Sequence, residues 1–246
     1  AEHREDGLQA YAAGNFNKAC QLWLIEAEKG CAISQNNLGT MYANGQGVEH
    51  SYKEAVKWYR MAAEQGEADA QNNLGVIYSQ VRDVPKNYKK AVKWYRKAAE
   101  QGHAIAQNNL GFMLESGQGL ERSYKNAVRW YRMAAEQGNA VAQCNLGNMY
   151  ANGQGVGQDH KQAVRWYRMA AAQGDADAQN NLGNMYFEGR GVPQNYEEAY
   201  TYWIEAEANG AAIARDNIEL AQRLMNLNQI KNGQQLAKQI RPRPGI

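Results

Sequence analysis

Residues 32–66 read AISQNNLGTMYANGQGVEHSYKEAVKWYRMAAEQG, and this stretch decides the fold because close copies of it follow along the chain. A glutamine followed by Leu-Gly three and four positions later recurs every 36 residues, at Gln35, Gln71, Gln107, Gln143 and Gln179. Trp-Tyr doublets keep the same spacing at Trp58, Trp94, Trp130 and Trp166. A fixed period of this length is typical of a protein in which one helical unit is copied in tandem.

Each copy predicts two helices joined by a loop. In residues 32–44 apolar side chains recur at helical spacing, and a Gly-x-Gly loop that begins at Gly45 ends the helix. Ser51 is a candidate N-cap for a second helix that runs to Gln65. Gly39 lies in the middle of the first helix, where glycine costs about 1 kcal/mol relative to alanine. Its return in every copy therefore implies that a neighbouring helix approaches closely.

The pattern resembles the Sel1-like repeat family, a branch of the tetratricopeptide superfamily. The motif Ala-x-x-Gln-x-x-Leu-Gly-x-x-Tyr-x-x-Gly-x-Gly-Val occupies residues 32–48, and Ala-x-x-Trp-Tyr-x-x-Ala-Ala occupies residues 55–63. Five copies cover residues 31–210. The resemblance implies an all-α fold, a right-handed α-solenoid (superhelix) of tandem helix-turn-helix repeats. It also implies a non-catalytic scaffold or adaptor that binds a protein or peptide in the concave groove.

The repeat boundaries divide the chain into caps and repeats. We expect a tetratricopeptide-like capping hairpin at 1–30, capping helices at 211–240 and a disordered tail at 241–246. Between the caps lie five repeats, at 31–66, 67–102, 103–138, 139–174 and 175–210. The second repeat carries Val81, Arg82 and Asp83 where the others have Gly-x-Gly. Its first helix must therefore end differently, with neutral drift as the simple explanation.

Charge and composition give few constraints on partners or location. The net charge of +2 does not favour attraction of the whole chain to nucleic acid or membrane, although residues 31–174 sum to +6 and residues 175–210 to −6. No apolar run approaches membrane-spanning length, and three irregularly spaced cysteines leave the compartment open. The chain starts at Ala1 without Met, through either a removed signal peptide or a trimmed sequence. The resemblance to Sel1-like proteins implies a bacterial periplasmic or secreted protein, which the Ala1 start fits, with a cytoplasmic location as the alternative.

We expect no catalytic residue, no metal site and no cofactor, and hence no enzyme. The Gly-x-Gly loops have no preceding strand and no following Lys-Ser/Thr, so they are helix ends and not phosphate-binding loops. The four histidines, His3, His50, His103 and His160, lack ligand-like spacing. No Ser or Cys recurs beside a base.

Cations recur in three rows on the predicted second helices, on the outer, convex surface. The rows are Lys53, Lys89, Lys125 and Lys161; Lys57, Lys93, Arg129 and Arg165; and Arg60, Arg96, Arg132 and Arg168. A solvated face is favoured over a phosphate-binding one, because long cationic stems cover apolar surface. Single-strand binding also needs exposed aromatic rings, and these Trp and Tyr residues stand at positions that we expect to be buried. Nucleic acid is therefore not the expected partner.

The predicted first helices carry the candidate binding site. One asparagine returns in every repeat on the face that lines the concave surface of tetratricopeptide-like arrays: Asn37, Asn73, Asn109, Asn145 and Asn181. An amide both donates and accepts hydrogen bonds, which suits a peptide backbone. In tetratricopeptide relatives an Asn here often contacts peptide backbone or a terminal carboxylate, and the resemblance implies the same use. The alternative is that these amides bond to the backbone or loop of the next repeat.

Variable residues surround this asparagine ladder and are where specificity for a ligand would reside. A second asparagine row is interrupted by Cys144 and contains Asn36, Asn72, Asn108 and Asn180. The remaining predicted contacts are Val76, Phe112, Asn148, Asn184 and Phe187, of which the two phenylalanines are the aromatics expected to be exposed. The alternative function is binding or regulation of a cell-wall enzyme or glycan in the bacterial envelope, signalled by exposed Trp and Tyr. The sequence leaves the oligomeric state and the identity of the partner open.

Overall fold

The computed structural model describes residues 2–240, and every regular element among them is an α-helix. The tail predicted at 241–246 lies outside the described residues. The chain divides into two compact units, 1–122 and 123–246. Each unit is a row of helix pairs in which consecutive helices pack against one another.

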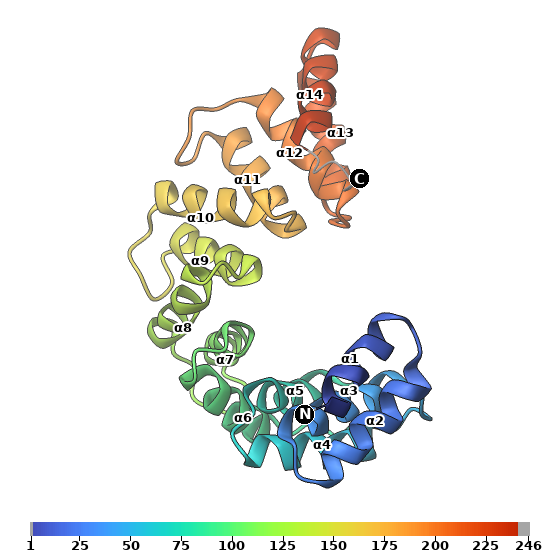
Figure 1. Cartoon of the computed structure of the whole chain (residues 1–246). Helices are drawn as coiled ribbons and strands as arrows, with labels where there is room; N and C mark the ends of the chain where they lie inside the picture. The colour runs from blue at the N-terminus through green and yellow to red at the C-terminus, as the bar shows by residue number, and fades with distance from the viewer. Residues whose placement is uncertain (1, 241–246) are drawn as a thin grey trace. The chain divides into compact units, whose positions relative to one another are not determined.

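The helices follow the predicted period. The first unit contains α1 (Glu2–Ala12), α2 (Phe16–Glu28), α3 (Ala32–Asn44), α4 (Tyr52–Glu64), α5 (Ala68–Gln80), α6 (Tyr88–Glu100) and α7 (Ala104–Ser116) (Figure 1). The second unit contains α8 (Tyr124–Glu136), α9 (Ala140–Asn152), α10 (His160–Ala172), α11 (Ala176–Glu188), α12 (Tyr196–Ala208), α13 (Ala214–Leu224) and α14 (Leu227–Ile240). The first helices of the five repeats are thus α3, α5, α7, α9 and α11.

Polar caps and glycines define the helix ends. The predicted N-cap is confirmed, because the Ser51 hydroxyl accepts a hydrogen bond from the Glu54 amide at 3.2 Å. The later second helices are capped in the same way by Asn87, Ser123, Asp159 and Asn195. Four of the five first helices end at a left-handed glycine, namely Gly45, Gly117, Gly153 and Gly189.

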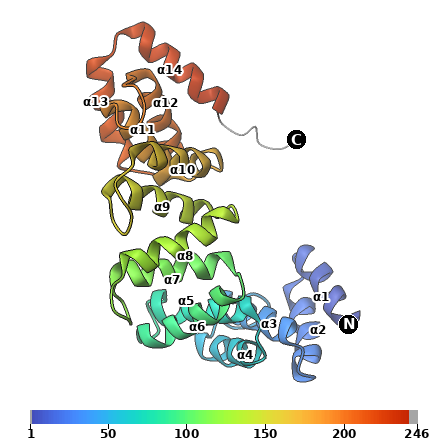
Figure 2. The ribbon, with the colours of Figure 1, turned by 90° about the vertical axis from the view of Figure 1, so that its left-hand side faces the viewer.

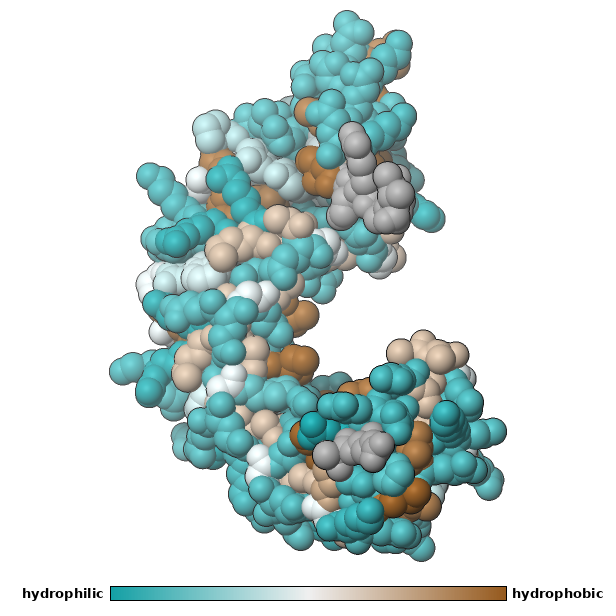
Figure 3. Space-filling model, in the orientation of Figure 1, coloured by the Kyte–Doolittle hydropathy of each residue, from teal (hydrophilic) through white to brown (hydrophobic). Residues whose placement is uncertain are grey.

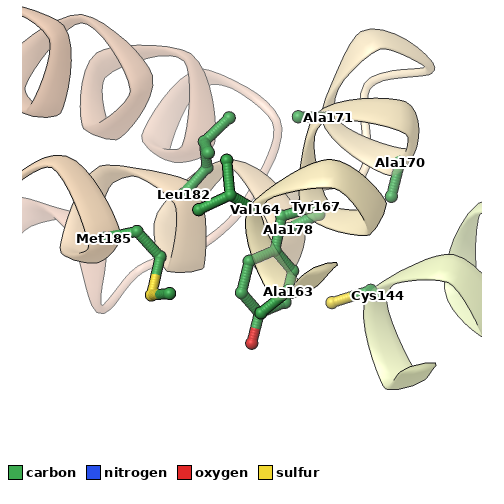
Figure 4. Close-up of a cluster of buried hydrophobic side chains, with 9 residues drawn as sticks. All are labelled: Cys144, Ala163, Val164, Tyr167, Ala170, Ala171, Ala178, Leu182 and Met185. Atoms are coloured by element: carbon green, nitrogen blue, oxygen red, sulfur yellow. The ribbon is translucent and has the colours of Figure 1, made fainter. Parts of the chain in front are cut away.

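Close approach explains the glycine in the middle of the first helices, as predicted. A Cβ atom on Gly39 would lie 2.6 Å from Cδ1 of Tyr59, the buried tyrosine of the second helix. In the second unit Gly147 meets the ring of Tyr167 in the same way. Figure 4 shows this Tyr167 ring in its buried cluster, between Cys144 of α9 and Leu182 and Met185 of α11. The tyrosine ring therefore occupies the space that a side chain would need.

The recurrent glutamine ties consecutive repeats together. Gln71 is buried, and its Nε2 donates to the carbonyl oxygen of Ala63, at the end of the preceding repeat, at 3.1 Å. Its Oε1 accepts from Nε2 of Gln101, at the end of its own repeat, at 2.8 Å. Gln35, Gln143 and Gln179 make the same pair of bonds. The glutamine is thus a scaffold residue.

The last helix packs through one side, which carries its apolar residues. Ile230 packs against the buried cluster of the second unit and Leu236 is half-buried, whereas Ile240 at the end of the helix is 41 % exposed. Gly233 and Ala237 are buried on this side, and α14 packs against α12 (Figure 2). Gly233 makes this contact possible, since a Cβ there would lie 2.5 Å from Cδ1 of Tyr200.

Candidate functional site: pockets between first helices

Three pockets open between consecutive first helices, at positions related by the repeat period. The Val76 pocket lies between α3 and α5 and measures about 620 Å³. The Phe112 pocket lies between α5 and α7 and measures about 250 Å³, and the Asn184 pocket lies between α9 and α11 and measures about 510 Å³. Each is lined by one asparagine of the ladder, respectively Asn73, Asn109 and Asn181. The candidate site is therefore a set of equivalent pockets.

A buried tyrosine from the intervening second helix lines each pocket: Tyr59, Tyr95 and Tyr167. The Tyr59 hydroxyl lies 2.9 Å from Oγ1 of Thr40, which itself donates to a backbone carbonyl. Tyr59 is therefore the donor in that pair. Tyr167 donates to Oδ1 of Asn148 at 2.6 Å. Burial raises the pKa of all three tyrosines, so the hydroxyls stay protonated at neutral pH and remain donors.

The ladder asparagines bond to side chains of the preceding repeat. Nδ2 of Asn73 donates to Oδ1 of Asn36 at 3.1 Å, and Nδ2 of Asn109 donates to Oδ1 of Asn72 at 3.1 Å. Neither the backbone nor the loop of a neighbouring repeat accepts these bonds, in contrast to the alternative considered from the sequence. Within the described residues, Oδ1 of Asn73 and of Asn109 takes part in no hydrogen bond. One end of the Asn73 and Asn109 amides thus holds consecutive repeats together, and the other end has no partner among the described residues.

The second asparagine row lies behind the ladder. Asn72, Asn108 and Asn180 are at most 8 % exposed, while Asn36 is half-buried. Burial follows from the packing of consecutive first helices and from the role of Asn36 and Asn72 as acceptors for the ladder. Of the ladder members outside the pockets, Asn37 and Asn145 are half-buried.

One of the two predicted exposed phenylalanines is exposed. Phe112 is 51 % exposed on α7, where Ile105, two turns earlier, is 53 % exposed. Residues of this kind form the brown patches on the largely teal surface of Figure 3. The expectation for Phe187 is wrong, because its ring is half-buried 5.1 Å from Tyr196 and 5.4 Å from Trp203.

The Asn184 pocket contains fixed amide groups. Nε1 of Trp203 donates to Oδ1 of Asn184 at 3.1 Å, and an indole nitrogen can only donate, so this bond sets the orientation of the amide. The NH2 group of Asn184 then has no partner among the described residues. Sequence reasoning missed this arrangement, although a signal existed: the fifth repeat reads Tyr202-Trp203 where the others read Trp-Tyr. Arg190 at the rim forms an ion pair with Glu188.

The cation rows of the second helices cover aromatic surface. Nη2 of Arg132 donates to the hydroxyl of Tyr150, in the following repeat, at 2.8 Å. Arg60 and Arg168 make the equivalent bond to the tyrosine of the repeat that follows each of them. Nζ of Lys93 lies 5.2 Å from the centre of the Trp94 ring. These contacts are those of a solvated face whose cations shield tyrosine and tryptophan.

The described residues contain no group of three or more His, Cys, Asp or Glu side chains arranged to hold a metal ion. Among them, no helix is long and apolar enough to cross a membrane.

Tandem helix pairs with equivalent pockets between them define a repeat protein of the α-solenoid class. The family model for the Sel1 repeat matches residues 32–67, 68–103, 104–139, 140–175 and 176–210. The chain therefore belongs to the Sel1 repeat family. No curated protein matches it.

Solved structures agree with this assignment. A protective antigen present in uropathogenic Escherichia coli strains, displaying an SLR fold, is 36 % identical with a TM-score of 0.87. That match covers 91 % of this chain but 48 % of the antigen, so the chain spans about half the length of that protein. A Sel1 repeat protein from Oxalobacter formigenes is 34 % identical over 100 % of this chain and 99 % of its own, with a TM-score of 0.86. A putative Sel1 repeat protein from Klebsiella pneumoniae shares the fold, with a TM-score of 0.55 and 21 % identity. That match covers 82 % of this chain and 99 % of the Klebsiella chain.

Proposed function

We propose that this protein is a non-catalytic scaffold that binds a peptide or protein segment on the first-helix face of a unit, meaning the solvent-facing side of α3, α5 and α7 in the first unit or of α9 and α11 in the second. Sel1 repeat proteins commonly serve as protein-interaction scaffolds, and the pockets between first helices support a binding role for this face. The observation that carries the proposal is the equivalence of the pockets. Each repeats a ladder asparagine and a buried tyrosine, whereas the residues at 76, 112 and 184 differ.

The chemistry of the pockets supports a peptide ligand. The free carbonyl oxygens of Asn73 and Asn109 accept hydrogen bonds, as main-chain N–H groups require. The NH2 group of Asn184 donates, as main-chain carbonyls require. Phe112 and Ile105 are exposed on α7, the helix that also carries Asn109. They add apolar contact area, which usually accompanies polar recognition of a peptide backbone. The acceptors and apolar side chains of the first unit, and the donor of the second, each suit a peptide segment better than a small charged molecule.

The glycan alternative receives no support from the aromatic residues. A glycan site on this face would need exposed Trp or Tyr rings, and every Trp and Tyr that the structure describes is buried or half-buried. Phe112 is the exposed aromatic side chain of the described residues. We therefore retain the peptide-binding scaffold as the function.

A matched pair of substitutions tests the proposal. Phe112→Asp changes the first-helix face, and Met61→Asp makes the same kind of change on α4, where Met61 is 39 % exposed. Peptides selected from a random library on the full chain are titrated against both variants by isothermal calorimetry. We expect Phe112→Asp to weaken binding at least tenfold and Met61→Asp to leave it unchanged. Equal affinity for the two variants would place the binding surface elsewhere and refute the proposal.

A periplasmic or secreted location forms a second part of this proposal. Fractionation of native cells with an antibody to the protein tests it. Recovery in the periplasm or the medium supports the export expected from the sequence, and recovery in the cytoplasm overturns it.

A further inference from the structure

The loop of the second repeat cannot pack as the loops of the other repeats do. In those repeats the second glycine of Gly-x-Gly lies against the backbone at the start of the preceding second helix: Gly47 on Phe16, Gly119 on Tyr88, Gly155 on Tyr124 and Gly191 on His160. A Cβ atom on Gly47, whose φ is +71°, would lie 2.5 Å from the carbonyl oxygen of Phe16. The corresponding residue of the second repeat is Asp83. Its side chain excludes the same contact with Tyr52.

The end of α5 changes accordingly. Val81 follows the helix in an extended conformation, with φ −71° and ψ 123°, where the other repeats have a left-handed glycine. In the first repeat the next amide, that of Gln46, bonds back to the carbonyl of Met41 at 3.0 Å. Here Nζ of Lys86 bonds to the carbonyl of Val81 at 3.1 Å. The far end of the loop is unaltered, because the Asn87 amide still bonds to the Tyr78 carbonyl at 2.9 Å.

The Val76 pocket has different walls from the Phe112 pocket because of this loop. It is lined by Tyr52 and Val81, whereas their counterparts in the next repeat, Tyr88 and Gly117, do not line the Phe112 pocket. Val76 itself stands where Phe112 lines the next pocket, and the two pockets measure about 620 and 250 Å³. None of the residues that line the Val76 pocket carries a charge.

We propose that the Val76 pocket is a specificity pocket for one uncharged, apolar side chain of the size of leucine or tryptophan, carried by a bound peptide. This inference rests on the proposed function and specifies one position of its ligand. Val76, Val81 and the ring of Tyr52 supply apolar contacts, and the free Oδ1 of Asn73 accepts the N–H of the inserted residue. A charged side chain would lose its hydration against walls that offer no counter-charge. Full burial of a leucine-sized side chain corresponds to about tenfold to hundredfold in affinity.

Small probes test the pocket independently of any natural partner. N-acetyl-leucinamide and N-acetyl-tryptophanamide are titrated into the full, methyl-labelled chain, with N-acetyl-lysinamide and the α-amide of N-acetylglutamate as charged counterparts. We expect saturable shifts of the Val76, Ile77 and Val81 methyl resonances with the apolar probes, at least tenfold tighter than with the charged ones. No saturation with either apolar probe, or equal binding of the charged probes, overturns the proposal.

Two variants of the chain test whether the probes bind in the Val76 pocket. The double substitution Val81→Gly and Asp83→Gly restores the Gly-x-Gly loop, which the other repeats accommodate, so we expect a folded chain that binds apolar probes at least tenfold more weakly. Val76→Arg introduces a charge into the pocket without altering the loop and should have the same effect. Phe112→Ala is the control in the neighbouring pocket and should leave these shifts unchanged. If both pocket variants keep wild-type affinity, the proposal is wrong.

The outcome for the pocket is separable from that for the proposed function. If the small probes bind but no selected peptide depends on Phe112 for binding, the specificity pocket stands and the scaffold role is refuted. Peptide binding that depends on Phe112, with no response of the Val76 pocket to the probes, would refute the specificity pocket alone.

Discussion

Substitution of Gly75 by alanine tests the packing on which the pockets depend. Alanine favours a helix by about 1 kcal/mol over glycine, so an open site would gain stability. At Gly75, however, the new Cβ would overlap the ring of Tyr95 at Cδ1 and Cε1. Overpacking of this kind costs about 1–3 kcal/mol. The Tyr95 ring is fully buried, and its hydroxyl lies 2.8 Å from Oγ of Ser79, so withdrawal of the ring would sacrifice a hydrogen bond worth about 1 kcal/mol.

We therefore expect Gly75→Ala to lower the free energy of unfolding by about 1–3 kcal/mol, since overpacking and the lost bond outweigh the helical gain. Urea denaturation followed by circular dichroism measures the global change. Hydrogen exchange of α5 and α6 measures the local one, because a repeat array need not unfold in one step. Gly157 is the control, because a Cβ there would meet nothing within 4 Å. A Gly75→Ala variant as stable as the wild type would refute the close-packing argument.

Further substitutions distinguish frame from site. Gln71→Leu removes both bonds of a buried amide and should lower stability by about 1–3 kcal/mol in urea denaturation. Asn184→Asp keeps an oxygen acceptor for Trp203 and replaces the outward NH2 group, so the melting temperature should change little while selected peptides bind more weakly in calorimetry. Loss of melting temperature without loss of affinity would contradict this. Arg132→Met removes the part-buried hydrogen bond to Tyr150 and should cost about 1 kcal/mol, with peptide affinity unchanged.

The sequence predicts the residues that hold the repeats together, because these residues recur at the same position of each repeat. The Gly39 position indicated a close neighbour, and the structure supplies the Tyr59 ring. The Gln35 position recurs with the repeat period, and the structure shows there a buried amide that joins repeats. In both cases the physical requirement is identical in each copy, so the period alone reveals it.

The sequence could not decide the role of the asparagine ladder, because an amide has two ends. Position on a helical wheel shows that Asn73 faces its neighbours, but not which atom does so. The structure directs Nδ2 to Asn36, which is a scaffold role, and leaves Oδ1 without a partner among the described residues. Phe187 was misjudged for a related reason. Its exposure depends on the Trp203 ring of another helix, which a wheel drawn for one helix does not include.

The departure at Val81 and Asp83 shows why loss of a motif deserves a structural explanation before drift is accepted. Sequence reasoning registered two absent glycines and could say only that the helix ends differently. The difference extends to Tyr52, which lines the Val76 pocket together with Val81, whereas Tyr88 and Gly117 do not line the Phe112 pocket. Each pocket takes its walls from two consecutive repeats, so duplication of the unit also duplicates the pocket. Substitutions at a few wall positions then alter its size and polarity without touching the Gln, Gly and Tyr residues that hold the repeats together. A constant frame with locally variable pockets lets one fold acquire a particular peptide ligand at little cost in stability.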